Sequence, residues 1–143
     1  DMLVNQAQNA IISGKNPVPM GSSHPNLVPY RAYKTLDSEF VIAVGSDEQW
    51  EKLALALRLE IPLDSDWSKN SQRVEDRKLI DAMISKSVKQ LTSSELESLL
   101  DGIPCAPVNS IKQALSDPNS TERGMLSSTL GIKHVSSPHR FHN

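Results

Sequence analysis

The chain has 143 residues, of which 38% are hydrophobic and 22% charged, and its formal net charge is −2. This length suffices for one domain with a buried core, and a near-neutral chain without a basic stripe disfavours nucleic acid as a partner. No apolar run approaches the roughly 18–20 residues that a membrane-spanning helix needs, and the single cysteine excludes an internal disulfide. We therefore expect a soluble α/β or α+β protein of a reducing compartment, with neither nucleic acid nor membrane as partner.

The first 26 residues predict a helix followed by a proline-rich loop. Apolar residues recur at helical spacing before Gly14, which is well placed to cap the C-terminus of that helix. Residues 15–26 hold three prolines and cannot continue it. The beginning lacks the basic, apolar and small-residue order of a signal peptide, so we interpret it as the last turns of a helix that starts outside this chain.

Residues 27–45 predict a β-hairpin. Its first arm mixes apolar and polar residues, and its second arm is apolar without interruption from Phe40 to Val44. Asp37 and Ser38 between the arms are turn residues, because their short side chains bond their own backbone. The apolar second arm predicts a strand that is covered on both faces.

Helical patterns fill most of the remaining chain. Ser46 with Gln49, and Thr92 with Glu95, form two capping boxes that predict helices over residues 47–59 and 93–100. Apolar spacing predicts the longest helix over residues 71–91. We expect an extended segment at 103–109, a short helix at 110–116 that ends near Asp117-Pro118, and a strand pair at 125–135 with its turn near Gly131. These elements predict an α+β fold, in which a hairpin-based antiparallel sheet is covered by three or four helices.

Several conspicuous side chains have a simple structural interpretation. The two tryptophans, Trp50 and Trp67, are expected to anchor the core. Cys105 has no sequence neighbour that would stabilise a thiolate, so we expect a packed thiol and not a nucleophile. Three histidines lie near the C-terminus without the carboxylates or the second cysteine that would complete a metal site, and we predict no metal there; they are His134, His139 and His142.

Arg73 and Arg77 stand one helical turn apart and could together hold an anion. The alternative that we favour is a structural role. In it, the two guanidinium groups pair with acids such as Asp76 or Asp81, or they tie their helix to neighbouring elements.

Four motifs occur in an order that resembles one protein family. They are G-x-x-H-P-N-x-V-P-Y at 21–30, followed by the hairpin and Gln49-Trp50; R-V-x-x-R at 73–77; G-I-P-C-A-P-V-N at 102–109; and D-P at 117–118 with R-G-M at 123–125. Together they are similar to family III CoA-transferases, the formyl-CoA and carnitine CoA-transferase group, and they cover nearly the whole chain. The resemblance implies the smaller domain of a two-domain fold, whose larger Rossmann-like domain is built from both chain ends, in an interlocked homodimer.

The resemblance also implies a division of the chain. Residues 1–26 would be a linker helix and loop from the larger domain, residues 27–135 the small α+β domain, and residues 136–143 the start of the return linker. In the family an Asp carboxylate attacks the acyl-CoA thioester, and the resulting enzyme–CoA thioester is resolved by an acceptor acid. That Asp would lie upstream, so we expect no catalytic residue in this chain and no activity from it alone. CoA thioester and carboxylic acid are then substrates, and no bound cofactor is implied.

The loop that carries Gly21, Ser22, Ser23, His24 and Asn26 corresponds to the family's glycine-rich lid, which shields reactive intermediates from water. It has a single glycine where the formyl-CoA branch has several, which gives weight to a role for the His24 or Asn26 side chain in substrate binding. The alternative is that Gly21 makes a turn and that His24 and Asn26 cap it.

Two other functions remain open. Racemisation of 2-methylacyl-CoA occurs in the same superfamily, but racemases tend to replace the H-P-N-x-V-P-Y segment, so its presence favours transfer. A non-enzymatic interaction or dimerisation module is the third hypothesis. Enzymes of this family occur in bacterial cytoplasm and in mitochondria, and we expect a cytoplasmic protein, with a mitochondrial one as the alternative.

Overall fold

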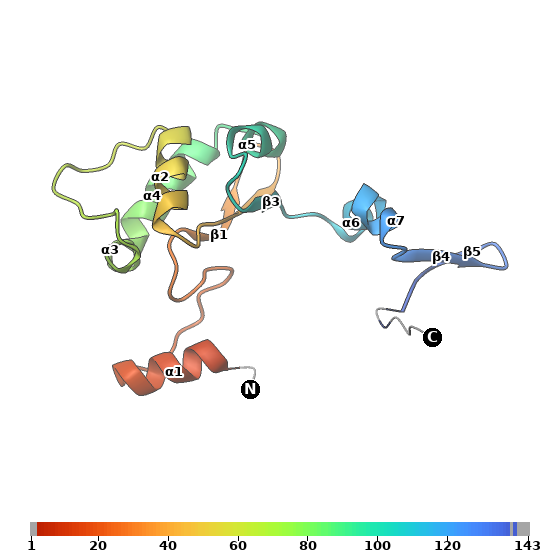
Figure 1. The fold of residues 1–143 in the computed structure, drawn as a ribbon, viewed down its shortest axis with the longest axis horizontal. Helices are drawn as coiled ribbons and strands as arrows, with labels where there is room; N and C mark the ends of the chain where they lie inside the picture. Colours follow the sequence, from red (N-terminus) through yellow and green to blue (C-terminus); the bar gives the residue numbers. More distant parts are fainter. Residues whose placement is uncertain (1–2, 138, 140–143) are drawn as a thin grey trace. The chain divides into compact units, whose positions relative to one another are not determined.

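The computed structural model describes residues 3–137 and residue 139. The chain divides into two compact units, Asp1–Val108 and Asn109–Asn143. The first unit holds α1 (Val4–Ser13), β1 (Tyr30–Lys34), β2 (Glu39–Ala43), α2 (Asp47–Ala56), α3 (Asn70–Glu75), α4 (Arg77–Val88), α5 (Ser93–Leu99) and β3 (Cys105–Pro107) (Figure 1). The second holds α6 (Ile111–Ser116), α7 (Pro118–Glu122), β4 (Leu126–Thr129) and β5 (Ile132–Val135). The mixture of helices and small antiparallel sheets confirms the α+β class.

The predicted hairpin is the centre of a three-stranded antiparallel sheet with the order β1-β2-β3. Tyr33 pairs with Phe40 across the hairpin, and Ile42 pairs with Cys105 of β3, the segment expected to be extended. The turn is closed by the Thr35 side chain, whose Oγ1 accepts the backbone N–H of Ser38 at 3.0 Å. The expectation that β2 is covered on both faces is wrong. Phe40 and Ile42 are fully buried, whereas the opposite face is only half-buried, because the core helices cover one side of this sheet.

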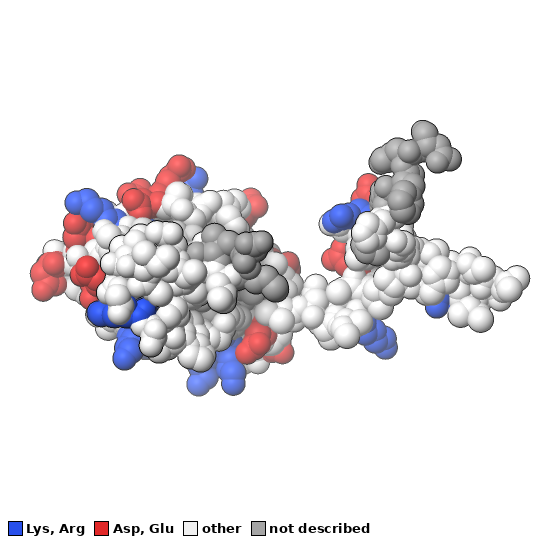
Figure 2. All heavy atoms as spheres, turned by 90° about the horizontal axis from the view of Figure 1, so that it is seen from below, with Lys and Arg blue, Asp and Glu red and all other residues white. Residues whose placement is uncertain are grey.

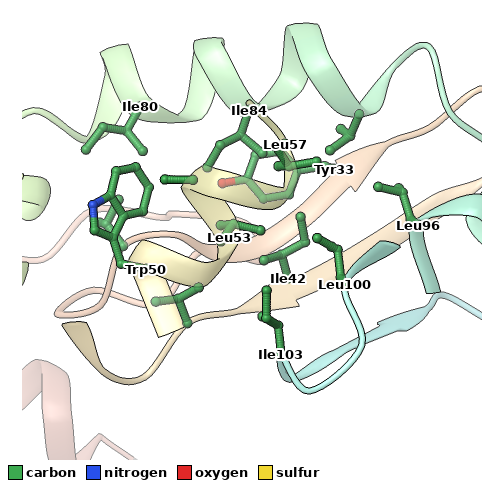
Figure 3. Packing of buried hydrophobic residues seen from close by; sticks show 14 of the residues in the cluster. Tyr33, Ile42, Trp50, Leu53, Leu57, Ile80, Ile84, Leu96, Leu100 and Ile103 are labelled. Carbon is green, nitrogen blue, oxygen red and sulfur yellow. The ribbon is translucent and has the colours of Figure 1, made fainter. Parts of the chain in front are cut away.

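The hydrophobic core lies between the sheet and helices α2, α4 and α5 (Figure 3). Trp50 and Trp67 are both buried, as predicted, and their rings meet edge to face with centroids 6.3 Å apart. The buried hydrophobic side chains of this cluster are Val28, Tyr33, Phe40, Ile42, Val44, Trp50, Leu53, Ala54, Leu57, Trp67, Ile80, Ile84, Val88, Leu96, Leu100 and Ile103.

Helix starts agree with the capping residues in the sequence. The Ser46 side chain accepts the Gln49 N–H before α2, but the predicted box there is incomplete, because the Gln49 side chain accepts the N–H of Gly45. Thr92 and Glu95 form a complete capping box before α5. Ser110 and Gln113 form another box before α6. Helix α7 was not predicted: Asp117-Pro118 ends α6, but proline is also favourable at the first position of a helix, and here it starts the next one.

Helix ends differ more from the prediction. Helix α2 stops at Ala56 and not near residue 59, because the backbone reaches a left-handed conformation at Arg58, where φ is 50°. The single helix predicted over residues 71–91 is two helices, with a break at Asp76 (φ −90°, ψ 15°). The carboxylate of Asp76 accepts the indole N–H of Trp67 at 2.8 Å, a contact between segments that local spacing does not encode.

The second unit contains the strand pair that the sequence predicts, β4 with β5, joined at Leu130 and Gly131, both with positive φ. Among its described residues none is buried. The boundary of the two units at Val108–Asn109 falls inside the small domain predicted at residues 27–135, and that domain assignment stays a prediction.

Among the described residues, no helix is long and apolar enough to cross a membrane. Acidic and basic side chains alternate around the larger body on the face shown in Figure 2, and no continuous basic patch is visible on that face.

Candidate functional site

The glycine of the candidate loop makes a turn. Gly21 has a φ of 60°, a left-handed conformation that favours glycine, and the N–H of Ser23 donates to the Met20 carbonyl at 3.1 Å. No atom lies within 4 Å of the place where a Cβ of Gly21 would stand. The requirement for glycine is therefore conformational and does not come from a crowded neighbour.

The loop is fastened to the first strand along its length. The Ser22 hydroxyl oxygen accepts the Ala32 N–H at 3.1 Å, and the His24 N–H donates to the Tyr30 carbonyl at 2.9 Å. Two such bonds at the start of β1 fix the loop beside the sheet. A freely swinging glycine-rich lid is a poor description of this segment.

The imidazole of His24 is held in one orientation. Its ring stacks on Tyr30 with centroids 5.2 Å apart and an interplanar angle of 23°. Its Nδ1 accepts the backbone N–H of Asn26 at 3.1 Å. A neutral imidazole that accepts at Nδ1 carries its proton on Nε2, so His24 offers an Nε2–H donor.

The side chain of Asn26 links the loop to α1. Its amide exchanges two hydrogen bonds with the amide of Asn9, at 2.9 and 3.2 Å. Both side chains are exposed, and the reciprocal pair joins residues 17 positions apart in the sequence. Asn26 thus has a tertiary partner, and it is more than a local cap of the turn.

Polar side chains of α3 and α4 hold the backbone of the same loop from the other side. Arg77 Nη2 donates to the Pro25 carbonyl at 2.8 Å. Asn70 Nδ2 donates to the Asn26 carbonyl at 2.8 Å, and its Oδ1 accepts the Val28 N–H at 3.2 Å. Sequence reasoning missed Asn70, because the predicted helix began at residue 71 and Asn70 counted as part of the connector before it; in the structure it is the first residue of α3.

Arg73 is the most buried of these polar groups, with its side chain 1% exposed. Its guanidinium donates to the Val28 carbonyl at 2.8 Å, pairs with Asp47 at 2.8 Å, and lies over the Trp50 ring at 5.3 Å. The prediction that it ties the helix to its neighbours is confirmed, but Asp76 and Asp81 are not its ion-pair partners. Asp76 accepts from Trp67, as described above, and Asp81 is engaged elsewhere.

Asp81 belongs to a separate buried network. It accepts the Tyr33 hydroxyl at 2.7 Å and pairs with Arg31 at 3.1 Å. Burial first, and then the hydrogen bond to Asp81, raise the pKa of Tyr33 far above its ordinary value. This phenol therefore stays protonated and serves the fold.

The remaining candidates carry no chemistry in the described residues. Burial raises the pKa of the half-buried Cys105 thiol, and the charge of Glu97 raises it further, which supports a packed, unreactive thiol. The described residues include no group of three or more side chains that could hold a metal ion. His134 bonds Thr129 at 3.0 Å, and His142 lies outside the described residues.

The loop can bind and orient a ligand through the Nε2–H donor of His24 and the hydroxyl groups of Ser22 and Ser23. Its described residues contain no nucleophile that is activated by a neighbouring base. The arrangement therefore offers hydrogen-bond donors to a ligand, and covalent chemistry would need another group.

The model of the protein family described as CoA-transferase family III matches residues 1–143. The chain belongs to the family III CoA-transferases. Among its relatives is the succinate–glutarate CoA-transferase of Agrobacterium fabrum, 32% identical over 127 residues, which are 87% of this chain and 32% of that protein. Another is the succinyl-CoA:mesaconate CoA-transferase of Haloarcula marismortui, 34% identical over 115 residues, which are 79% of this chain and 28% of that protein.

A solved structure supports the same assignment. The crystal structure of a CaiB/BaiF family protein from Brucella suis superposes with a TM-score of 0.81 at 36% identity, covering 97% of this chain and 38% of that one. This family III chain thus spans about a third of the length of its curated relatives, 32% and 28% for the two named above.

Proposed function

We propose that the protein moves CoA between carboxylic acids, with this chain forming the smaller domain of a longer enzyme. The observation that supports this most directly is the family match over all 143 residues, which includes the loop at residues 21–28. The named relatives act on succinate, glutarate and mesaconate. We therefore propose that the donor is the CoA thioester of a dicarboxylic acid, such as succinyl-CoA, and that the acceptor is a free dicarboxylic acid.

In the proposed reaction a carboxylate nucleophile, an Asp outside this chain, attacks the thioester carbonyl of the donor. The C–S bond breaks, CoA leaves as a thiolate, and an acyl–enzyme anhydride remains. The thiolate then attacks the enzyme's own carbonyl, which releases the donor acid and leaves an enzyme–CoA thioester. The acceptor carboxylate resolves this thioester by the same two steps in reverse order. Both intermediates react readily with water, so the site must exclude it.

We propose that the loop of Gly21, Ser22, Ser23, His24 and Asn26 lies beside these intermediates. The fixed Nε2–H of His24 can donate to a substrate carboxylate or to the thioester oxygen, where charge develops in the transition state. The tethers to β1, α1, α3 and α4 support this role, because a donor that is already oriented costs no reorganisation during the reaction.

Helix α1 supports the proposed linker at residues 1–26. It contains no charged residue, it exposes Ile11 and Ile12, and it faces the viewer in Figure 2 as an uncharged surface. Leu3, the residue before the helix, is exposed as well. An apolar groove of about 470 Å³ runs between α1 and residues 17–19. We propose that the remainder of the enzyme covers this surface in an interlocked homodimer.

The deciding experiment uses the longer polypeptide that carries this chain. It is incubated in D₂O with a panel of acyl-CoAs and free dicarboxylic acids, and the thioesters are identified by mass spectrometry. A new CoA ester is the expected result and identifies both substrates. Deuterium at the α-carbon without a new ester would make the protein a racemase. If neither a new CoA ester nor deuterium is found, the interaction module is the better description. On this proposal the 143-residue chain alone should give no turnover, because the attacking Asp is proposed to lie outside it.

The role of His24 is tested by His24→Phe, which keeps an aromatic ring on Tyr30 and removes the donor. Loss of one donor of this kind typically lowers kcat by about 100-fold or more, and we expect a drop of at least about tenfold. Lys15→Ala, an exposed change at the start of the same loop, is the control and should leave kcat unchanged. Wild-type kcat in His24→Phe would remove His24 from the proposed site.

A further inference from the structure

Arg77 and His24 are connected through a single peptide group. Arg77 Nη2 donates to the carbonyl oxygen of Pro25, and the N–H of Asn26 donates to Nδ1 of His24. The Pro25 carbonyl and the Asn26 N–H belong to the same peptide unit, which is planar. The orientation of one end therefore determines the orientation of the other.

We propose that Arg77 fixes the tautomer and the orientation of His24 through this peptide. A guanidinium at the carbonyl end of a peptide polarises it and strengthens the N–H at the opposite end as a donor. A stronger Asn26 N–H keeps Nδ1 of His24 as an acceptor, and the imidazole proton is then held on Nε2. Arg77 is thus a positioning residue, and its consequence for catalysis rests on the proposed function of the loop.

The surroundings reinforce this geometry. Asn70 holds the next carbonyl of the loop, that of Asn26, at 2.8 Å, so the two successive peptide groups are oriented by side chains of adjacent helices. Stacking on Tyr30 restricts rotation of the His24 ring. The Asn9 amide holds the Asn26 side chain, which leaves its backbone N–H available for His24. Because Arg77 begins α4, its position is set by the break at Asp76, which separates α3 from α4.

The connection explains why an arginine is used at this place. The guanidinium of Arg77 donates to a backbone carbonyl and not to a carboxylate, so this contact orients a peptide group. A water molecule could satisfy the same carbonyl at this half-exposed position, but it would not fix the peptide plane. A side chain that reaches from a helix of the core confers the rigidity of that helix on the loop.

The direct test is the tautomer of His24, measured by ¹⁵N NMR of the imidazole nitrogens in the 143-residue chain. The two ring nitrogens are distinguishable, and the His24 signals are assigned by their loss in His24→Gln. The wild type should show a protonated Nε2 and a bare Nδ1. Arg77→Met should show a mixture of both tautomers, together with exchange of the Asn26 amide that is at least about tenfold faster, because an opened hydrogen bond no longer protects it.

Two matched variants separate positioning from general stability. Arg77→Lys keeps a cationic donor and should retain the wild-type tautomer. Lys78→Ala removes an exposed cation from the next position of the same helix and should change nothing. Where Arg77→Met does not fold, Arg77→Gln replaces it, because its shorter neutral side chain falls short of the Pro25 carbonyl. An unchanged tautomer in Arg77→Met or Arg77→Gln, or a wild type protonated at Nδ1, would overturn the proposal.

The catalytic consequence is measured separately in the longer polypeptide. Displacing an oriented donor by about 1 Å can cost about 100-fold in rate, and we expect Arg77→Met to lower kcat between about 10- and 100-fold while KM for acyl-CoA stays within about twofold. If the wild type transfers no CoA but the tautomer behaves as described, the proposed function fails and the positioning of His24 stands. If the wild type transfers CoA and the tautomer is insensitive to Arg77, only the positioning fails.

Discussion

The two units of this chain are built on different principles. In the first, a hydrophobic cluster that runs from Val28 to Ile103 joins the sheet to α2, α4 and α5. In the second, helices and a strand pair form although none of the described residues from position 109 onward is buried. Its exposed apolar side chains include Ile111, Leu130 and Ile132. Local capping and turn chemistry are thus enough to specify elements, whereas a core is needed to make them stable together.

The largest contrast is expected from matched isoleucines. Ile84 is fully buried in α4, and Ile132 is 69% exposed in β5. Ile84→Ala should lower the free energy of unfolding by about 2–5 kcal/mol, since it removes buried methyl groups and leaves a cavity. Ile132→Ala should change it by less than about 0.5 kcal/mol. Urea denaturation followed by tryptophan fluorescence measures this difference, because both tryptophans report on the first unit. Equal effects of the two changes would mean that the units do not differ as described.

A dependence on alkaline pH that comes from tyrosine should belong to the first unit alone, because both tyrosines of the chain lie there. The raised pKa of Tyr33 means that the unfolded chain loses this proton first, at about pH 10. The contribution of Tyr33 to the free energy of unfolding is therefore complete below pH ~10. It is lost as pH rises above this value, by about 1.4 kcal/mol per pH unit.

Tyr33→Phe tests this dependence. At pH 7 it should cost about 1–2 kcal/mol, because the hydrogen bond to Asp81 is lost. Above pH ~10 the wild type should weaken toward the variant, so that the two denaturation curves converge. A constant difference between the two proteins from pH 8 to pH 11 would contradict the assignment.

The smallest effect is expected at two similar helix N-caps, one in each unit. Thr92 and Ser110 each form a complete capping box, one in each unit. Thr92→Ala should lower the free energy of unfolding by about 1 kcal/mol, since α5 carries the buried Leu96. Ser110→Ala should leave urea denaturation unchanged and speed amide exchange only within α6. A loss of global stability in Ser110→Ala would show that α6 belongs to the same cooperative unit as the core.

The candidate loop could be found from the sequence, but its supports could not. Glycine, serine, histidine and asparagine in a proline-rich segment before a hairpin mark a candidate for a functional loop. The bond from Arg77 to the Pro25 carbonyl joins residues 52 positions apart, and that from Asn70 to the Asn26 carbonyl spans 44. Spacing alone favoured nearby acids as partners of Arg73, whereas the carboxylate that it pairs with, Asp47, lies 26 positions away.

The sequence by itself determined where most elements begin and which fold class they form. The capping residues Ser46, Thr92 and Ser110, the hairpin turn and the Gly131 turn all act within a few residues, so their physics is readable locally. Tertiary structure alone decided the break at Asp76, the one-sided cover of β2 and the pairing of Arg73 with Asp47. Each of these depends on which distant side chain or helix reaches a given group, and that choice is made only when the core packs.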